Sequence, residues 1–96
     1  MMKLERVLEI FSDESFKRTD RKVLPTGKLT ERYELKTLSS DGKYHYDFLI
    51  KETTFNECAT VSFGKWEPLC SFTCCFDICD ENFLLHIIEE CKQGIL

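Results

Sequence analysis

Cysteine is the residue type in this chain with the greatest potential for chemistry. Six cysteines occur among 96 residues, and four follow the spacing C-x3-C-C-x3-C: Cys70, Cys74, Cys75 and Cys79. Structural zinc sites use C-x2-C pairs more often. On a strand, Cys70 and Cys74 would share a face but lie roughly 13 Å apart, too far for one zinc ion with bonds of ~2.3 Å. The spacing favours reduced core thiols, with metal binding and a disulfide as alternatives.

Catalysis by a thiol needs a cysteine of low pKa beside a base. The two histidines are His45 and His86. His45 is expected on the same sheet face as Cys75, so strand order decides whether this pair can meet. His86 is expected on the solvent side of a helix. Asp77, Asp80 and Glu81 fit helix capping better than a carboxylate pair for sugar hydrolysis. We therefore expect no enzyme activity, no metal and no cofactor.

Two amphipathic helices are predicted near the ends of the sequence. Leu4, Val7, Leu8 and Phe11 follow helical spacing. A second helix is expected to begin after Asp80, its cap, and to end at Gly94, with Ile95 packing back on it. Its buried stripe is expected to contain the following residues: Phe83, Leu84, Ile87, Ile88 and Cys91.

Between the helices, period-two alternation predicts strands. Residues 29–38 and 43–51 alternate around an Asp41-Gly42 turn, which indicates a hairpin. Residues 58–63 and 69–77 form two further runs, with a turn expected at 64–68. Residues 21–24 could add a short strand before the turn at Pro25-Thr26-Gly27.

These elements predict an α+β fold with a single domain over residues 1–96. The architecture is a two-layer sandwich: an antiparallel meander sheet of four strands, or five with residues 21–24. The N- and C-terminal helices pack on one face, because each strand has one apolar side that must be covered.

Charge is distributed unevenly along the chain, whose net charge is −4. Residues 1–56 carry 11 basic and 10 acidic side chains, whereas residues 57–96 carry 2 and 7. An acidic half repels phosphate backbones, which argues against nucleic-acid binding, and it favours a basic protein partner. The basic candidate for nucleic acid is expected to be a solvated loop: Lys17, Arg18, Arg21 and Lys22.

The resulting functional hypothesis is a small acidic protein-binding module that inhibits or masks a macromolecular target. Phage anti-CRISPR inhibitors and toxin-neutralising immunity proteins exemplify this class of behaviour. Contact is expected through an acidic face (Asp77, Asp80, Glu81, Glu89 and Glu90) or through the outer sheet face (Arg32, His45, Asp47, Thr60 and Thr73). The outer sheet face would also suit a homodimer. The alternative hypothesis is a small cysteine-dependent metal-binding or thiol redox protein.

The apolar runs do not exceed three residues, as in Phe48-Leu49-Ile50, so no membrane span is expected. The N-terminal residues interleave apolar and charged side chains and do not resemble a secretory signal. We therefore expect a cytoplasmic protein with reduced cysteines.

Overall fold

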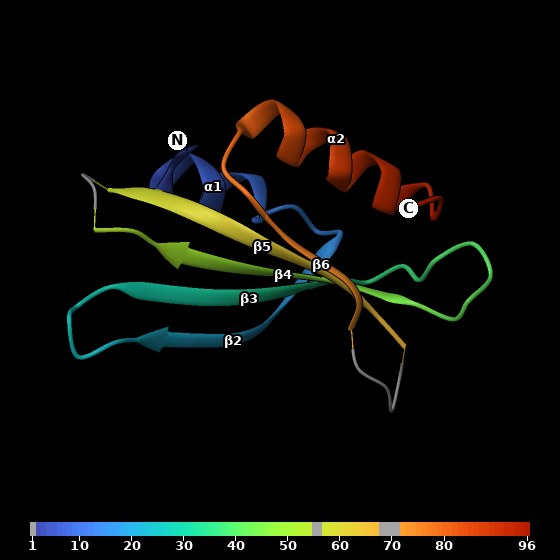
Figure 1. Cartoon of the computed structure of the whole chain (residues 1–96), viewed down its shortest axis with the longest axis horizontal. Coiled ribbons are helices and arrows are strands. Elements are labelled where there is room, and N and C mark those ends of the chain that lie inside the picture. The colour runs from blue at the N-terminus through green and yellow to red at the C-terminus, as the bar shows by residue number, and fades with distance from the viewer. Residues whose placement is uncertain (1, 55–56, 68–71) are drawn as a thin grey trace.

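Both helices pack on the same face of an antiparallel sheet, which confirms the predicted two-layer α+β sandwich (Figure 1). The computed structural model describes residues 2–54, 57–67 and 72–96, and the side chains of all of these except residues 72–75. The elements in chain order are β1 (Met2–Lys3), α1 (Leu4–Ile10), β2 (Phe16–Val23), β3 (Leu29–Leu35), β4 (His45–Glu52), β5 (Cys58–Trp66), β6 (Phe72–Ile78) and α2 (Glu81–Lys92).

The sheet is a meander in which β2 to β6 each pair with the next strand along the chain. β1 adds a short sixth strand among the described residues. It pairs with Cys58 and Ala59 on β5, and β6 pairs with the following residues of that strand, from Val61 to Trp66. The sequence predicted five strands at most, one fewer than the six described. The missing strand is β1, because a strand of two residues is too short to show alternation.

β2 is longer than the expected short strand at residues 21–24 and begins at Phe16. The ladder with β3 shifts register between Arg18 and Asp20, where Thr19 is the extra residue of a bulge. This bulge interrupts the alternation that would have revealed the strand. The turn that follows is as predicted, with Gly27 at φ 83° donating its N–H to the Leu24 carbonyl at 2.8 Å.

The connection between β3 and β4 is longer than the predicted hairpin turn, because β3 ends at Leu35 and β4 begins at His45. The expected turn does form within it. Gly42 has φ 74° and donates its N–H to the Ser39 carbonyl at 2.9 Å. The backbone N–H of Ser40 donates to the Gly94 carbonyl at 2.8 Å, so this connection is fixed to the end of α2.

β5 continues through Gly64 to Trp66, where the sequence had predicted a turn from residue 64. Gly64 pairs with Asp47 on β4, so the glycine sits inside the sheet and does not end the strand. Leu69 and Cys70, which we placed at the start of the last strand, lie outside the described residues. β6 is described from Phe72.

Aromatic rings form a continuous path through the core between the two layers. Phe11, the C-cap residue of α1, contacts Phe48 on β4 at 5.2 Å between ring centroids. Phe48 contacts Phe63 on β5 at 5.2 Å, and Phe63 contacts Phe76 on β6 at the same distance. Phe48 and Phe63 are fully buried. Because burying one large apolar side chain contributes about 1.5–3 kcal/mol, these contacts are a main source of the attachment of α1 to the sheet.

α2 is capped and ended as its sequence predicts. The Asp80 carboxylate accepts a hydrogen bond from the Phe83 N–H at 2.9 Å. At the other end, the Gly94 N–H donates to Cys91 and the Ile95 N–H to Glu90, the hydrogen bonds of a Schellman motif. Ile95 does not pack back on the helix as expected, since 63 % of it is exposed.

Charged side chains connect the two ends of α2 to the N-terminal part of the chain. Arg6 on α1 donates to Glu81 at 3.1 Å, and Lys92 donates to Asp13 at 2.7 Å. Both pairs are exposed, so each contributes little to stability. Within the described residues, neither helix has the length and apolar character needed to cross a membrane.

The docking of α2 on the β3–β4 connection predicts a difference between two glycine substitutions. Gly42→Ala should cost about 1–2 kcal/mol, because alanine disfavours positive φ, and nothing lies within 4 Å of the added Cβ. Gly94→Ala should lower the free energy of unfolding further, because its Cβ would lie 2.8 Å from the Ser40 backbone nitrogen. Urea unfolding of both variants measures this difference. Equal losses would contradict the tight approach at Gly94.

Candidate interaction surfaces

The side chains predicted to bind a partner lie on two different surfaces. Asp80 and the α2 residues Glu81, Glu89 and Glu90 belong to the helix layer. Arg32, His45, Asp47 and Thr60 lie on the sheet face opposite the helices, as their alternation with buried core residues requires. Thr73 lies in β6, and its side chain is outside the described residues. The two surfaces given as alternatives by the sequence are therefore separate in the structure.

Asp77 belongs with the outer sheet face and not with the acidic residues of α2. It lies opposite Ser62 in the β5–β6 ladder. The Ser62 hydroxyl donates to its carboxylate at 2.5 Å, and the Lys51 ammonium lies 3.9 Å away. We therefore define the acidic face of α2 by four residues: Asp80, Glu81, Glu89 and Glu90.

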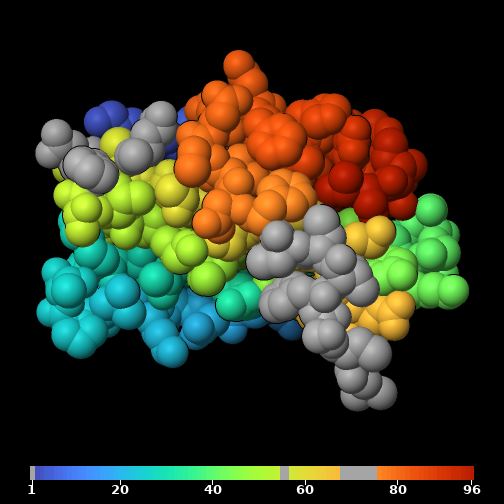
Figure 2. Space-filling view, in the orientation of Figure 1, coloured from blue at the N-terminus to red at the C-terminus, as the bar shows by residue number. Residues whose placement is uncertain are grey.

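The acidic face of α2 has few cations to neutralise it. Glu81 pairs with Arg6, and the side chains of Glu89 and Glu90 contact Gln93 at 3.3 Å and His86 at 3.0 Å. A neutral amide and a histidine leave most of the negative charge of this face uncompensated. In Figure 2, α2 (orange to red) forms much of the upper surface of the molecule.

Phe83 was predicted in the buried stripe of α2, and this prediction is wrong. Its side chain is 44 % exposed and contacts Phe76 at 6.0 Å between ring centroids. Four other residues already complete the buried stripe: Leu84, Ile87, Ile88 and Cys91. Phe83 lies at the margin of that stripe, so the helix presents an aromatic ring beside its carboxylates.

The outer sheet face is held together by its own charges. Arg32 donates to Asp47 across β3 and β4, and 6 % of Asp47 is exposed. Burial raises the pKa of Asp47, and the opposing effects of the Arg32 charge and hydrogen bond do not cancel this. This pair leaves little net charge at the centre of the face.

His45 is also satisfied within the outer sheet face. Its Nδ1 atom lies 3.0 Å from Glu34, and its ring stacks on Trp66 at 4.6 Å between centroids with an angle of 18°. The strand order places β5 between β4 and β6, with His45 opposite Trp66 and Cys75 opposite Gly64. The Cα positions of His45 and Cys75 are thus separated by a whole strand and offset by two residues, roughly 12 Å at ~4.8 Å per strand spacing and ~3.3 Å per residue.

The cysteines fall into different environments. Cys91 is fully buried in the core, and burial raises the pKa of its thiol to about 12. Cys79 is exposed between β6 and α2, and Cys58 is buried on β5. Cys70 lies outside the described residues, as do the side chains of Cys74 and Cys75. Within the described part of the chain, no three metal-binding side chains converge. Metal binding by the C-x3-C-C-x3-C cysteines stays an untested alternative hypothesis.

A buried carboxylate that the sequence analysis did not identify lies near the β2 edge of the sheet. Glu31 on β3 is 4 % exposed and accepts a hydrogen bond from the Tyr33 hydroxyl at 2.7 Å. Arg18 and Arg21 on β2 lie 3.5 and 3.6 Å from it. Burial, with the Glu31 contact, raises the pKa of Tyr33 to about 12. The alternation of Leu29, Glu31, Tyr33 and Leu35 could have placed this glutamate on the helix side.

The bulge at Thr19 explains how two arginines reach one carboxylate. Arg18 and Arg21 are three positions apart and would point to opposite faces of a regular strand. The extra residue between them restores both to the face of Tyr33 and Glu31. The basic group of β2 is therefore part of a strand, and the predicted solvated loop is wrong.

A hollow of ≈ 590 Å³ lies beside α1. Leu4 and Leu8 line it together with charged side chains, including Glu5, Glu52 and Glu57. Glu52 already accepts a hydrogen bond from the Leu29 N–H at 3.0 Å. Among the described residues, the acidic side chains of this hollow do not form a group that could hold a metal ion.

Comparison of the chain with protein-family models, curated proteins and solved structures finds no match. The argument for function therefore depends on the two surfaces themselves.

The buried position of Asp47 predicts a pH dependence of stability. A carboxyl whose pKa is higher in the folded than in the unfolded state stabilises the fold below the unfolded pKa, and this contribution falls as pH rises through the folded pKa. Asp47→Asn cannot ionise. The free energy of unfolding of the wild type minus that of the variant should therefore fall as pH rises above about 4. Urea unfolding across this range measures it, and a constant or rising difference would contradict the burial argument.

The two environments of Cys79 and Cys91 predict different reactivities. With iodoacetamide at about pH 8, Cys79 should be alkylated in the native protein, because it is exposed. Cys91 should react only after denaturation, because its thiol is buried and protonated. Peptide mapping by mass spectrometry follows each residue separately. Equal native rates at the two positions would show that Cys91 is not enclosed in the core.

Proposed function

We propose that this chain is a protein-binding module that inhibits or masks a macromolecular target by covering its basic surface with the acidic face of α2. The observation that carries the proposal is the exposed Phe83 ring beside this charge. Tight interfaces depend on a few well-packed anchors, often aromatic, surrounded by polar contacts. The acidic face of α2 has this composition, with an apolar ring and a carboxylate surround.

The helical positions of these residues support a shared contact. Asp80 and Phe83 are three positions apart, and Phe83 and Glu90 are seven apart, so these three lie along one side of the helix. Glu89 and Glu81 lie roughly 120° and 160° around the helix from Phe83, so they act through longer-range charge. Leu85 is also exposed, at 39 %, but it lies roughly 160° around the helix from Phe83, so it does not belong to this contact. A basic partner surface with an apolar pocket would satisfy both features at once.

The attachment of α2 supports a preformed surface. Its buried stripe, its Asp80 cap and the hydrogen bond between Ser40 and Gly94 fix the helix along its whole length. A rigid anchor loses little conformational entropy on binding, so more of the contact energy contributes to affinity. Long-range attraction between the acidic face and a basic partner would mainly raise the association rate.

The outer sheet face is a weaker candidate for this contact. Its central charges pair with each other, Arg32 with Asp47 and His45 with Glu34. A partner would gain little there without separating these partly buried pairs, and separating them is costly. We place the interaction in the cytoplasm, since the thiols of Cys79 and Cys91 fit a reducing compartment.

Affinity capture with matched variants tests this proposal. The wild type, Phe83→Ala and Glu89→Lys/Glu90→Lys serve as baits in lysate of the native host, with Thr60→Lys on the outer sheet face as the control. We expect the wild type and the control to retain the same basic protein, and the two α2 variants to lose it. Removing an anchor residue costs about 2 kcal/mol or more, roughly thirtyfold in affinity.

The charge-reversed variant should also show a smaller dependence of association rate on salt. Capture that survives both α2 variants and disappears with Thr60→Lys would refute the proposal and assign binding to the outer sheet face. Circular dichroism of each variant verifies that its fold is intact before capture is compared.

A further inference from the structure

β2 is an open edge of the sheet, and it lies on the border farthest from α2 (Figure 1). Among the described residues, β2 pairs with β3 alone. Seven of its eight residues are exposed, and Phe16 is the buried one. An edge strand of this length exposes backbone donors and acceptors to any chain that can pair with it.

The ladder determines which backbone groups of β2 point outward. The Leu24 N–H donates to the Lys28 carbonyl at 2.8 Å, so this pair is hydrogen-bonded. Hydrogen-bonded and non-bonded pairs alternate in an antiparallel ladder. Counting back along the register, Val23 and Arg21 occupy non-bonded positions, so their N–H and C=O groups face away from β3. Beyond the bulge, β2 thus offers a short regular segment for a further strand.

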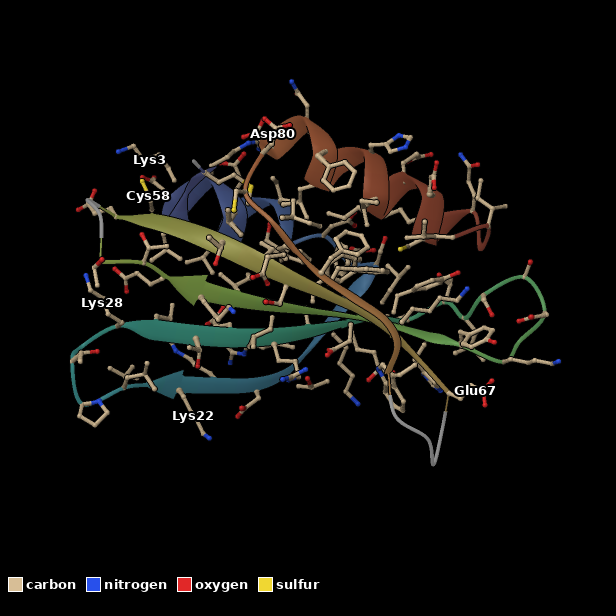
Figure 3. The ribbon with its side chains drawn as sticks, in the orientation of Figure 1. Lys3, Lys22, Lys28, Cys58, Glu67 and Asp80 are labelled. Carbon is tan, nitrogen blue, oxygen red and sulfur yellow. The ribbon has the colours of Figure 1, made fainter. Side chains whose placement is uncertain are left out.

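The charge of β2 selects which strand could pair with it. Four of its eight residues are basic and one is acidic: Lys17, Arg18, Arg21 and Lys22 against Asp20. Arg18 and Arg21 lie on the helix side, whereas the alternation places Lys17 and Lys22 on the outer side. Figure 3 shows the Lys22 side chain extending away from the sheet at this edge. A second copy of β2, with the same cations, would be repelled from both faces.

Glu31 positions the guanidinium groups of Arg18 and Arg21 where they could also bind a carboxylate of a partner. It holds both guanidinium groups on one side of the strand, while about half of each side chain remains exposed (51 % for Arg18 and 55 % for Arg21). Guanidinium groups have several donors and bind carboxylates well. Beside them, Val23 presents an apolar side chain that is 64 % exposed.

We propose that β2 accepts an extended acidic segment of a partner protein as an additional strand. Main-chain hydrogen bonds form at Arg21 and Val23, and carboxylates of the segment meet the cations of β2 on each face. An apolar residue of the segment lies beside Val23. Strand addition of this kind obtains affinity from the backbone and selectivity from alternate side chains. This surface is separate from the acidic face of α2 and opposite to it in charge.

The test uses a fluorescein-labelled peptide of eight residues with one central valine and glutamate at the other positions, so that an extended strand carries carboxylates on both faces. The same peptide with lysine in place of glutamate is its charge control. We expect the acidic peptide to bind more tightly as salt is lowered and the basic peptide not to bind. Amide NMR shifts should be centred on Arg21 and Val23. Absence of binding at millimolar acidic peptide, or shifts centred on another strand, would overturn the proposal.

A pair of variants at one position isolates the backbone bond. Val23→Pro removes the outward N–H, and an edge strand tolerates proline there. Val23→Thr keeps the N–H and the β-branched shape. Val23→Pro should weaken peptide binding at least tenfold relative to Val23→Thr, while both retain the native amide NMR spectrum elsewhere. Equal affinities for the two variants would exclude strand addition.

Charge reversal distinguishes strand addition from nucleic-acid binding and from the α2 surface. Lys17→Glu/Lys22→Glu should abolish acidic-peptide binding, and it leaves the Arg18–Glu31–Arg21 contacts in place. A single-stranded oligothymidine that binds the wild type and Val23→Pro equally would refute the proposal and assign a nucleic-acid role to this edge. Glu89→Lys/Glu90→Lys should leave peptide binding at least as tight as in the wild type, so failure here and failure of the proposed function are separate results.

Discussion

The contact of Phe11 with the fully buried Phe48, and of Phe48 with Phe63, is the interaction on which the rest of the structure depends. These rings join α1 to the middle of the sheet, and α2 packs on the same face through its own apolar stripe. Because both helices cover one face, every other position in the strands points to the outer face of the sheet. The two layers therefore decide which polar side chains become surface and what neighbours they have there.

A consequence of this arrangement is a separation of charge across the molecule. The acidic residues of α2 lie over one border of the sheet, and the basic residues of β2 form the opposite border. The labelled Asp80 and Lys22 in Figure 3 mark the two regions. Between them, the outer sheet face carries pairs that neutralise each other, such as Arg32 with Asp47. The surfaces with uncompensated charge are thus the borders, and these are where we expect partners of opposite sign.

The sequence predicts the parts of this fold that follow a regular period. The alternation of Tyr46, Phe48 and Ile50 and that of Ala59, Val61 and Phe63 each place residues that are buried in the structure. The Asp80 cap and the Gly94 terminus are also as expected, because both depend on local backbone chemistry.

The features that the sequence does not predict depend on irregularity or on tertiary contacts. The bulge at Thr19 breaks the period and hides the first half of β2. The sequence predicts a turn at Gly64, but Gly64 pairs with Asp47 on β4 and β5 continues through it. Phe83 is apolar and adjacent to the stripe of α2, and only the packing of the helix shows that its ring is left at the surface. The bulge brings both arginines of β2 to one face, and the exposed Phe83 ring gives α2 its apolar anchor.

Zero-length cross-linking tests the central claim about α2 most directly. A carbodiimide joins a carboxylate to a contacting lysine amine with loss of water, so it records carboxylates that touch a partner. With the captured partner bound, the account predicts cross-links from Glu89 and Glu90 of α2 to partner lysines. Cross-links confined to Asp77 and Glu34 on the outer sheet face, with none from α2, would contradict it.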